Sequence, residues 1–275
     1  MTETKTGAAD GSAPQTEADA FEDSERVPVP GGLWRVPPRM AALGAWTTAC
    51  YLAMAAGLLT RRKAVAKSDL RRVWTHRWGK GVCRIMGIRF SVEGAPPSGT
   101  LLVSNHLGYL DIPVLASHVQ TLFLSKAEVA SWPLMGFFAR QAGTLFVQRE
   151  RKRDLPQVAS QIAQELGSGG AVVLFPEGTS GAGDSVLPFR ASLLDPPARG
   201  DLPVSYARLT YSTPPGYPAA GKCVCWWGDM SFGGHFLGLL RLPYVHAEVR
   251  FGAEPLSHSD RKVLALQLWK AVQSL

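Results

Sequence analysis

Short apolar runs alternate with helical stretches from about Arg89 to the end of the chain, and this alternation most constrains the fold. A chain that repeats strand and helix in this way is expected to form an α/β domain, in which helices cover a sheet. The expected strands are Arg89–Glu93, Thr100–Ser104, Thr121–Ser125, Thr144–Val147, Ala171–Phe175, Leu202–Leu209, Lys222–Trp227 and His246–Phe251. The expected helices are Pro113–His118, Trp132–Arg140, Asp154–Gly167 and Asp260–Ser274.

The segment from Met40 to Thr60 contains 21 residues without a charge. As a helix it would be about 31 Å long, close to the thickness of the hydrocarbon layer of a bilayer. We expect it to associate with a membrane; its many alanines leave open a buried helix of a soluble protein or a shallow re-entrant hairpin. Because Arg61, Arg62 and Lys63 follow it directly, the positive-inside rule predicts that its C-terminal side faces the cytoplasm.

The stretch from Arg61 to Arg89 holds ten basic residues and one acidic residue, Asp69. Trp74 and Trp78 lie among them, a combination that suits a helix in the interface of an anionic membrane. The alternative is the solvated basic face of an ordinary amphipathic helix.

Charge is unevenly distributed along the chain, whose net charge is +7. The first 30 residues hold two basic and seven acidic side chains, a net charge of −5, so the remaining 245 carry +12. We therefore divide the chain into a disordered acidic tail (1–32), a membrane-associated helical segment (33–90) and the α/β domain (91–275). A basic surface attracts anionic membranes, nucleic acid or phosphate-bearing ligands, and no nucleic-acid-binding motif is recognisable, so no nucleic-acid partner is expected. The four cysteines and six histidines show no zinc-type spacing, so no metal site is expected either.

The strongest local signal is an apolar run that ends in Asn105-His106, with Asp111 following after four intervening residues. Polar groups just past the carboxyl end of a strand lie where open α/β sheets bind ligands. A neutral imidazole can take a proton from a hydroxyl when a carboxylate holds its other nitrogen. Spacing alone is also compatible with a helix cap next to a turn histidine.

Two further stretches carry polar residues at the ends of expected strands. One strand stops at Pro176 and exposes Glu177, Gly178 and Thr179 in a turn; an ordinary loop would look the same. Another strand delivers Arg149, which could hold a phosphate or belong to a solvated charge run.

Together these stretches resemble the motif blocks of the glycerolipid acyltransferases, the 1-acylglycerol-3-phosphate or lysophospholipid acyltransferase family. The blocks are NHLGYLD (105–111), GTLFVQR (143–149), FPEGT (175–179) and, more loosely, LPVSYA (202–207), in the order and at roughly the spacing of the family. Four ordered blocks are far more specific than one. The resemblance covers about Lys80 to the C-terminus and implies a mixed sheet flanked by helices, preceded by a membrane-associated helical segment.

The resemblance implies an O-acyltransferase that moves a fatty acyl group from a coenzyme A or acyl-carrier-protein thioester to the hydroxyl of a lysolipid such as 1-acylglycerol-3-phosphate. His106 would be the general base and Asp111 would orient it. Arg149, Glu177, Gly178 and Thr179 would bind the acceptor, with the amides near Gly178 and Thr179 as conjectured oxyanion donors. Lys126 would add positive charge to the donor or acceptor site.

No cofactor beyond the thioester cosubstrate is implied. The expected partners are the lysolipid acceptor, acyl-CoA or acyl carrier protein, and an anionic membrane surface, with the catalytic domain on its cytoplasmic face.

The chain departs from the lysophosphatidate enzymes in one block. Many of them carry Arg directly after FPEGT, where this chain has Ser180. Arg190, close by in sequence, could supply the missing cation. The runs VLPFRASLL and CWWGDMSF resemble a branch that includes lyso-ornithine-lipid acyltransferases, so lyso-ornithine lipid or another lysolipid is the alternative acceptor. A lipid-binding protein without activity on the same fold is the alternative from another class.

Overall fold

The computed structural model describes residues 27–275 except 62, 133–134, 148–154 and 201. A sheet of seven strands in the order β1-β7-β6-β2-β5-β3-β4 forms its centre. Only the β6–β7 pair is antiparallel, so the sheet is mixed, as expected. The strands are β1 (Ile88–Glu93), β2 (Leu101–Ser104), β3 (Thr121–Lys126), β4 (Leu145–Val147), β5 (Ala171–Leu174), β6 (Val204–Ser212) and β7 (Val245–Phe251).

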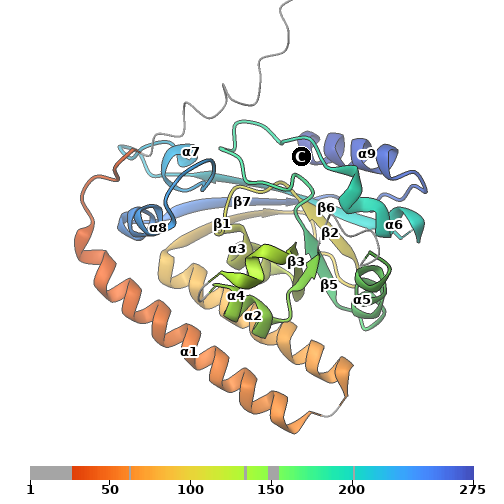
Figure 1. Cartoon of the computed structure of the whole chain (residues 1–275). Helices are drawn as coiled ribbons and strands as arrows, with labels where there is room; N and C mark the ends of the chain where they lie inside the picture. Colours follow the sequence, from red (N-terminus) through yellow and green to blue (C-terminus); the bar gives the residue numbers. More distant parts are fainter. Residues whose placement is uncertain (1–26, 62, 133–134, 148–154, 201) are drawn as a thin grey trace, which may run out of the picture.

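Helices cover both faces of the sheet (Figure 1). Helices α2 (Ala64–Met86), α3 (Asp111–His118) and α8 (Phe232–Arg241) share a core with one face, and α5 (Leu155–Gly167), α6 (Asp195–Arg199) and α9 (Arg261–Ser274) share a core with the other. Along β2 the side chains of Leu101, Leu102 and Val103 alternate between the two cores, and all are fully buried. This two-sided burial explains why the central strands are continuous apolar runs.

Helices α1 (Val36–Thr60) and α2 form an antiparallel hairpin along one side of the domain (Figure 1). The two helices approach closely at Gly81, where a Cβ would collide with the ring of Trp46. The indole of Trp46 donates to the carbonyl of Trp78, and that of Trp78 donates to Thr47. Helix α1 begins at Val36, four residues before the expected Met40, because the prolines in its first turn are compatible with the start of a helix.

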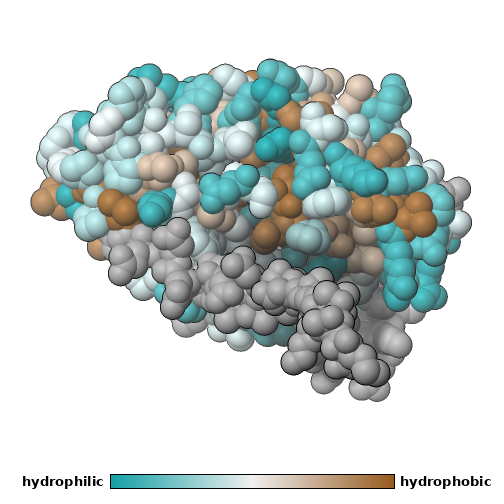
Figure 2. Space-filling view, turned by 90° about the horizontal axis from the view of Figure 1, so that it is seen from above, coloured by the Kyte–Doolittle hydropathy of each residue, from teal (hydrophilic) through white to brown (hydrophobic). Residues whose placement is uncertain are grey.

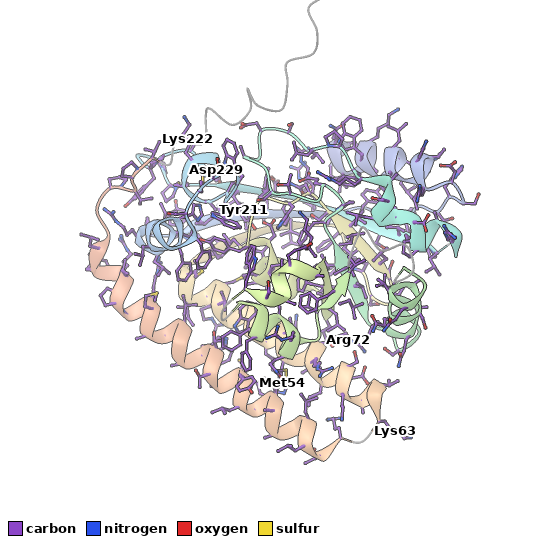
Figure 3. The ribbon with its side chains drawn as sticks, in the orientation of Figure 1. Met54, Lys63, Arg72, Tyr211, Lys222 and Asp229 are labelled. Atoms are coloured by element: carbon purple, nitrogen blue, oxygen red, sulfur yellow. The ribbon has the colours of Figure 1, made fainter. Side chains whose placement is uncertain are left out.

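Helix α2 belongs to the core of the domain as much as to the hairpin. Val82, Cys83 and Met86 are buried in the core that α3 shares with the sheet. At the other end of the helix, the buried Arg72 forms an ion pair with Glu165 of α5, and Figure 3 shows Arg72 on the part of α2 that lies toward α5. The basic face expected to meet lipid therefore covers only part of this helix, and the boundary at residue 90 stays a prediction.

Most expected elements are confirmed to within a few residues, including α4 (Met135–Ala142). The strand expected at Lys222–Trp227 is wrong: Ala220–Cys223 forms the short helix α7, followed by an irregular segment. Cys223 and Cys225 are buried free thiols. The segment is apolar because it is buried beside the loop between β2 and α3, where the N–H of Trp226 donates to the carbonyl of Leu107. The disorder predicted for 1–32 falls largely on residues outside the described chain.

Candidate active site

Two parallel neighbouring strands, β2 and β5, bring their carboxyl ends to one edge of the sheet. His106 lies two residues beyond β2, and Glu177 lies three residues beyond β5. Helix α3 begins at Asp111, so its positive N-terminal end points to the same edge. The motifs NHLGYLD and FPEGT, 70 residues apart in the sequence, therefore meet in space.

His106 and Asp111 form the pair that the sequence predicts. The distance from His106 Nδ1 to Asp111 Oδ2 is 2.7 Å. The Asp111 side chain is fully buried, whereas the His106 side chain is 24% exposed. A carboxylate can only accept, so the neutral imidazole carries its proton on Nδ1 and leaves Nε2 as a proton acceptor. The imidazole ring stacks on Phe175 at a centroid distance of 4.2 Å, which fixes its plane.

The carboxylate of Asp111 is held by three other donors. Oδ2 also accepts from the backbone N–H of Leu107 at 2.6 Å and of Gly108 at 3.1 Å. Oδ1 accepts from the hydroxyl of Tyr211 at 2.8 Å. Asp111 is also the first residue of helix α3, next to the positive end of the helix dipole. Asp111 is thereby fixed in the orientation that faces His106.

Tyr211 is a residue that the sequence analysis missed. It lies near the end of β6, 100 residues from Asp111, and Figure 3 shows it near the centre of the molecule. Burial, together with the neighbouring charge of Asp111, raises the pKa of Tyr211 well above its ordinary value, so the hydroxyl keeps its proton and donates it. Only the pairing of β6 with β2 places the two groups together, and no local pattern could have shown it.

Gly108 is required at a turn of the loop between β2 and α3 (residues 105–110), which carries His106 and is called the catalytic loop below. Its φ is +142°, and a Cβ there would lie 2.9 Å from the backbone nitrogen of Trp226. A larger residue would push the loop away from the segment that holds it.

Glu177 points inward and joins two loops. Oε2 accepts from the N–H of His106 at 3.1 Å, and Oε1 accepts from the N–H of Leu187 at 3.0 Å. Burial raises the pKa of Glu177 to about 8, against the opposing effect of the two N–H donors. Its carboxyl group thus supports the backbone of His106; the residue is 3% exposed, and the acceptor contact predicted for it stays a prediction.

The other predicted acceptor residues differ in placement. Gly178 is buried at φ +77°, and its N–H donates to the carbonyl of Phe175 inside the turn. Thr179 is exposed on the same turn. Of the two predicted oxyanion donors, Gly178 therefore uses its N–H to close the turn.

The predicted cations lie around the same edge. Arg190 is exposed, and its Nε donates to the carbonyl of Glu177 at 3.1 Å, so the residue does lie beside the FPEGT turn. Lys126 is exposed at the carboxyl end of β3, which pairs with β5. Arg149 lies outside the described residues. Within the described part of the chain, no group of three or more His, Cys, Asp or Glu side chains could hold a metal ion.

An aromatic cluster around Tyr109 borders the catalytic loop. The Tyr109 hydroxyl lies 2.7 Å from His235 Nδ1, and His235 Nε2 lies 3.0 Å from the carbonyl of Cys225. A carbonyl only accepts, so Nε2 carries the proton and Tyr109 donates to Nδ1. Phe232 and Trp226 pack on the same ring, and Phe232 is largely exposed. Of the apolar residues of α8, some are thus core and some line the surface beside the site.

Comparisons with known proteins agree with this geometry. The family model "Acyltransferase" matches residues 87–204, which include the first three of the four motif blocks. A lyso-ornithine lipid O-acyltransferase of Brucella abortus is 36% identical over 70% of this chain and 78% of its own length. The chain belongs to the glycerolipid acyltransferase family. It is therefore an acyltransferase enzyme, as the motif blocks predict.

Two further comparisons concern the acceptor and the fold. A 1-acyl-sn-glycerol-3-phosphate acyltransferase of Neisseria meningitidis is 31% identical to this acyltransferase over 56% of the chain and 64% of its own length. The crystal structure of the 1-acyl-sn-glycerophosphate acyltransferase of Thermotoga maritima has a TM-score of 0.55 at 17% identity, covering 86% of this chain and 97% of that one. The second likeness confirms the fold.

Proposed function

We propose that this acyltransferase uses His106 as a general base to transfer a fatty acyl chain from an acyl thioester to a lysolipid hydroxyl. The observation that carries the proposal is the partly exposed imidazole whose Nδ1 is held by the buried carboxylate of Asp111. Nε2 takes the proton of the acceptor hydroxyl, the hydroxyl oxygen attacks the thioester carbonyl, and the C–S bond breaks. The imidazolium then returns its proton to the departing thiolate. Asp111 stabilises the imidazolium between these steps.

The favoured acceptor is a lyso-ornithine lipid. The support is that relatives named lyso-ornithine lipid O-acyltransferase match at 36%, 31% and 34% identity over 70–74% of the chain. Ser180 replaces the Arg of many lysophosphatidate enzymes, which removes a phosphate-binding group. Arg190, next to the FPEGT turn, supplies a cation at the site in its place. The second candidate is 1-acylglycerol-3-phosphate, favoured by the Neisseria relative.

An acceptor panel tests this assignment. The full chain in membranes is supplied with a labelled acyl thioester, as acyl-CoA or acyl carrier protein, and with lyso-ornithine lipid, 1-acylglycerol-3-phosphate or another lysophospholipid. We expect the fastest transfer to lyso-ornithine lipid. Faster transfer to 1-acylglycerol-3-phosphate would reverse the order of the two acceptors. No transfer to any acceptor would favour a lipid-binding protein.

Helix α1 supplies the membrane contact in this proposal. The segment Leu33–Thr60 is long and apolar enough to span a bilayer, and only 11% of its most apolar 18-residue stretch is buried. Its outer side carries exposed Met40, Leu52 and Leu59. By contrast, the part of the surface visible from the side of α7 and α9 mixes hydrophilic and apolar patches (Figure 2).

Because α1 packs along the basic helix α2, we propose that α1 lies in the interface of the membrane rather than crossing it alone. The cations of α2 cannot be placed in hydrocarbon at low cost. The catalytic domain then faces the cytoplasm, where anionic lipids attract basic segments.

Substitution of the outer face of α1 tests the anchor. Leu52→Asp with Leu59→Asp is expected to move the protein from the membrane fraction to the soluble fraction. The control change Leu266→Asp, on the exposed side of α9, is expected to leave the protein in the membrane fraction. Equal membrane retention of both variants would refute the anchor. Protease digestion of right-side-out and inside-out vesicles then distinguishes the two faces of the membrane.

A further inference from the structure

A second basic site lies at the opposite end of α3 from the catalytic pair. A pocket of about 800 Å³ opens between α2, the C-terminal end of α3, the start of β1 and the segment before β7. Five basic side chains line it: His76, Lys80, Arg84, Arg89 and His118. None of the described residues that line the pocket is acidic.

Among the described residues, no acidic side chain neutralises the positive charge of this pocket. Within the described part of the chain, Lys80, Arg84 and Arg89 form no ion pair, and Arg89 lies over the ring of Tyr244 at 3.7 Å. Like charges that converge without a counter-ion repel one another, which favours a bound anion.

The two histidines are oriented so that one ring nitrogen of each remains available. His76 Nδ1 lies 2.7 Å from the carbonyl of Ala116, and His118 Nδ1 lies 3.0 Å from that of Val114. Each Nδ1 therefore carries a proton and donates to the last turn of α3. Each Nε2 has no hydrogen-bond partner among the described residues. Once protonated, the two imidazoles would add two N–H donors to those of the lysine and the arginines.

The volume of the pocket and its apolar lining indicate that the ligand also has an uncharged part. A pocket of this volume suits an organic molecule rather than a single inorganic ion. Ile88, Phe90 and Tyr244 provide apolar surface next to the cations. A ligand that fits both the basic side chains and the apolar residues is a phosphate ester. Its phosphate would contact the cations, and its carbon chain would contact the apolar wall.

We propose that this pocket binds the phosphate ester head group of an anionic phospholipid. The lipid source is favoured because α2, which supplies three of the basic residues, packs along α1, the helix with the exposed apolar side (Figure 1). Arg39 of α1 also binds the carbonyl of Pro243, which lines the pocket. The preference for lipid rests on the proposed membrane contact, but the anion site itself does not rest on acyl transfer.

Ligand-induced stabilisation of the full chain in a non-ionic detergent tests the proposal. The probes are dihexanoylphosphatidylglycerol, dihexanoylphosphatidylcholine, glycerol 3-phosphate and inorganic phosphate, and the measurement is the shift in Tm with concentration. The pocket variant is Lys80→Glu with Arg84→Glu. The matched control, Lys262→Glu with Lys270→Glu on the exposed side of α9, makes the same change in net charge.

We expect phosphatidylglycerol to raise the Tm of the wild type and of the control, and to bind the pocket variant about tenfold or more weakly. An unchanged affinity in the pocket variant would overturn the site. Equal stabilisation by inorganic phosphate or glycerol 3-phosphate would overturn the lipid assignment in favour of a free phosphate ester, and equal stabilisation by phosphatidylcholine would overturn recognition of negative charge.

Two controls keep this result apart from folding and from catalysis. If the glutamate variant fails to fold by circular dichroism, Lys80→Gln with Arg84→Gln removes the charges without reversing them and is held to the same criterion. His106→Ala is expected to show the wild-type Tm shift, so failure of the proposed general base leaves the pocket result standing. Loss of the shift in His106→Ala would place the ligand in the active site and overturn the second site.

Discussion

The two ends of helix α3 hold histidines in opposite settings. At the N-terminal end, the partner of His106 is the buried carboxylate of Asp111. At the C-terminal end, the partners of His76 and His118 are backbone carbonyls, and the cation of Lys80 acts on both imidazoles. The helix dipole favours this distribution, with the acid at the first turn and the basic groups at the last.

This contrast shows why only one of these imidazoles is suited to take a proton from a substrate. Burial, and secondarily the charge of Lys80, lowers the pKa of His76 and of His118. Within the residues that the structure describes, neither pairs with a carboxylate that could stabilise the cation created by proton transfer. His106 has one, held by three further donors. The residue type is the same, and its partner decides the chemistry.

Replacing His106 removes the only one of these imidazoles that is paired with a carboxylate among the described residues. We expect His106→Ala to lower kcat by about a hundredfold or more, because the acceptor hydroxyl loses its general base. The assay is steady-state acyl transfer to the best acceptor of the panel. His246→Ala, on strand β7 between β1 and β6, is the matched control and should stay close to wild type. Activity of His106→Ala near wild type would exclude it as the base.

Tyr211→Phe tests how far the fixed carboxylate matters. We expect kcat to fall by about tenfold while KM changes little, since a charge-assisted hydrogen bond to Asp111 is lost without touching the substrate. Tyr206→Phe, on the same strand, removes a hydroxyl that makes no hydrogen bond within the described residues and should have little effect. If both variants behaved alike, the contact with Asp111 would have no role in positioning His106.

Glu177 gives the catalytic end a characteristic pH dependence of stability. Its pKa is raised from 4.5 to about 8 by burial, so between these pH values the folded chain binds a proton that the unfolded chain has lost. The free energy of unfolding should therefore fall as pH rises from 4.5 to about 8. Above that range, Glu177 should cause no further fall. Chemical denaturation at a series of pH values should show this slope in the wild type and in the exposed control Glu128→Gln.

The slope should be absent from Glu177→Gln. That variant should also be less stable at low pH, because the amide nitrogen cannot accept from the N–H of His106 or Leu187. A slope that persisted unchanged in Glu177→Gln would assign it to another group.

The opposite end of α3 should respond to pH with the opposite sign, and more weakly. Because the pKa of His76 is lowered in the folded chain, its contribution is present above the ordinary value of 6.5 and is lost as pH falls below it. His76→Ala should lower the free energy of unfolding by about 1 kcal/mol at neutral pH, through the lost bond to Ala116, and should reduce the loss on acidification. A stability profile unchanged by this substitution would contradict both expectations.

The strands and the motif residues were predictable because their signals are local. The apolar runs of β2 and β5 and the polar residues that follow them lie within short windows, and parallel pairing brings their ends together. The segment Lys222–Trp227 misled the prediction for the same reason: it is apolar because the catalytic loop buries it, and burial alone does not distinguish a strand from a turn.

The sequence by itself determined the fold class, the His106–Asp111 pair and the family, since each depends on spacing between residues close along the chain. Tertiary structure alone decided that Tyr211 holds Asp111, that Glu177 faces inward and that α2 belongs to the core. It also gathered basic residues from α2, α3 and β1 around one pocket. The physical reason is that these contacts join segments far apart in sequence, and only the packing of the sheet and its helices sets which groups become neighbours.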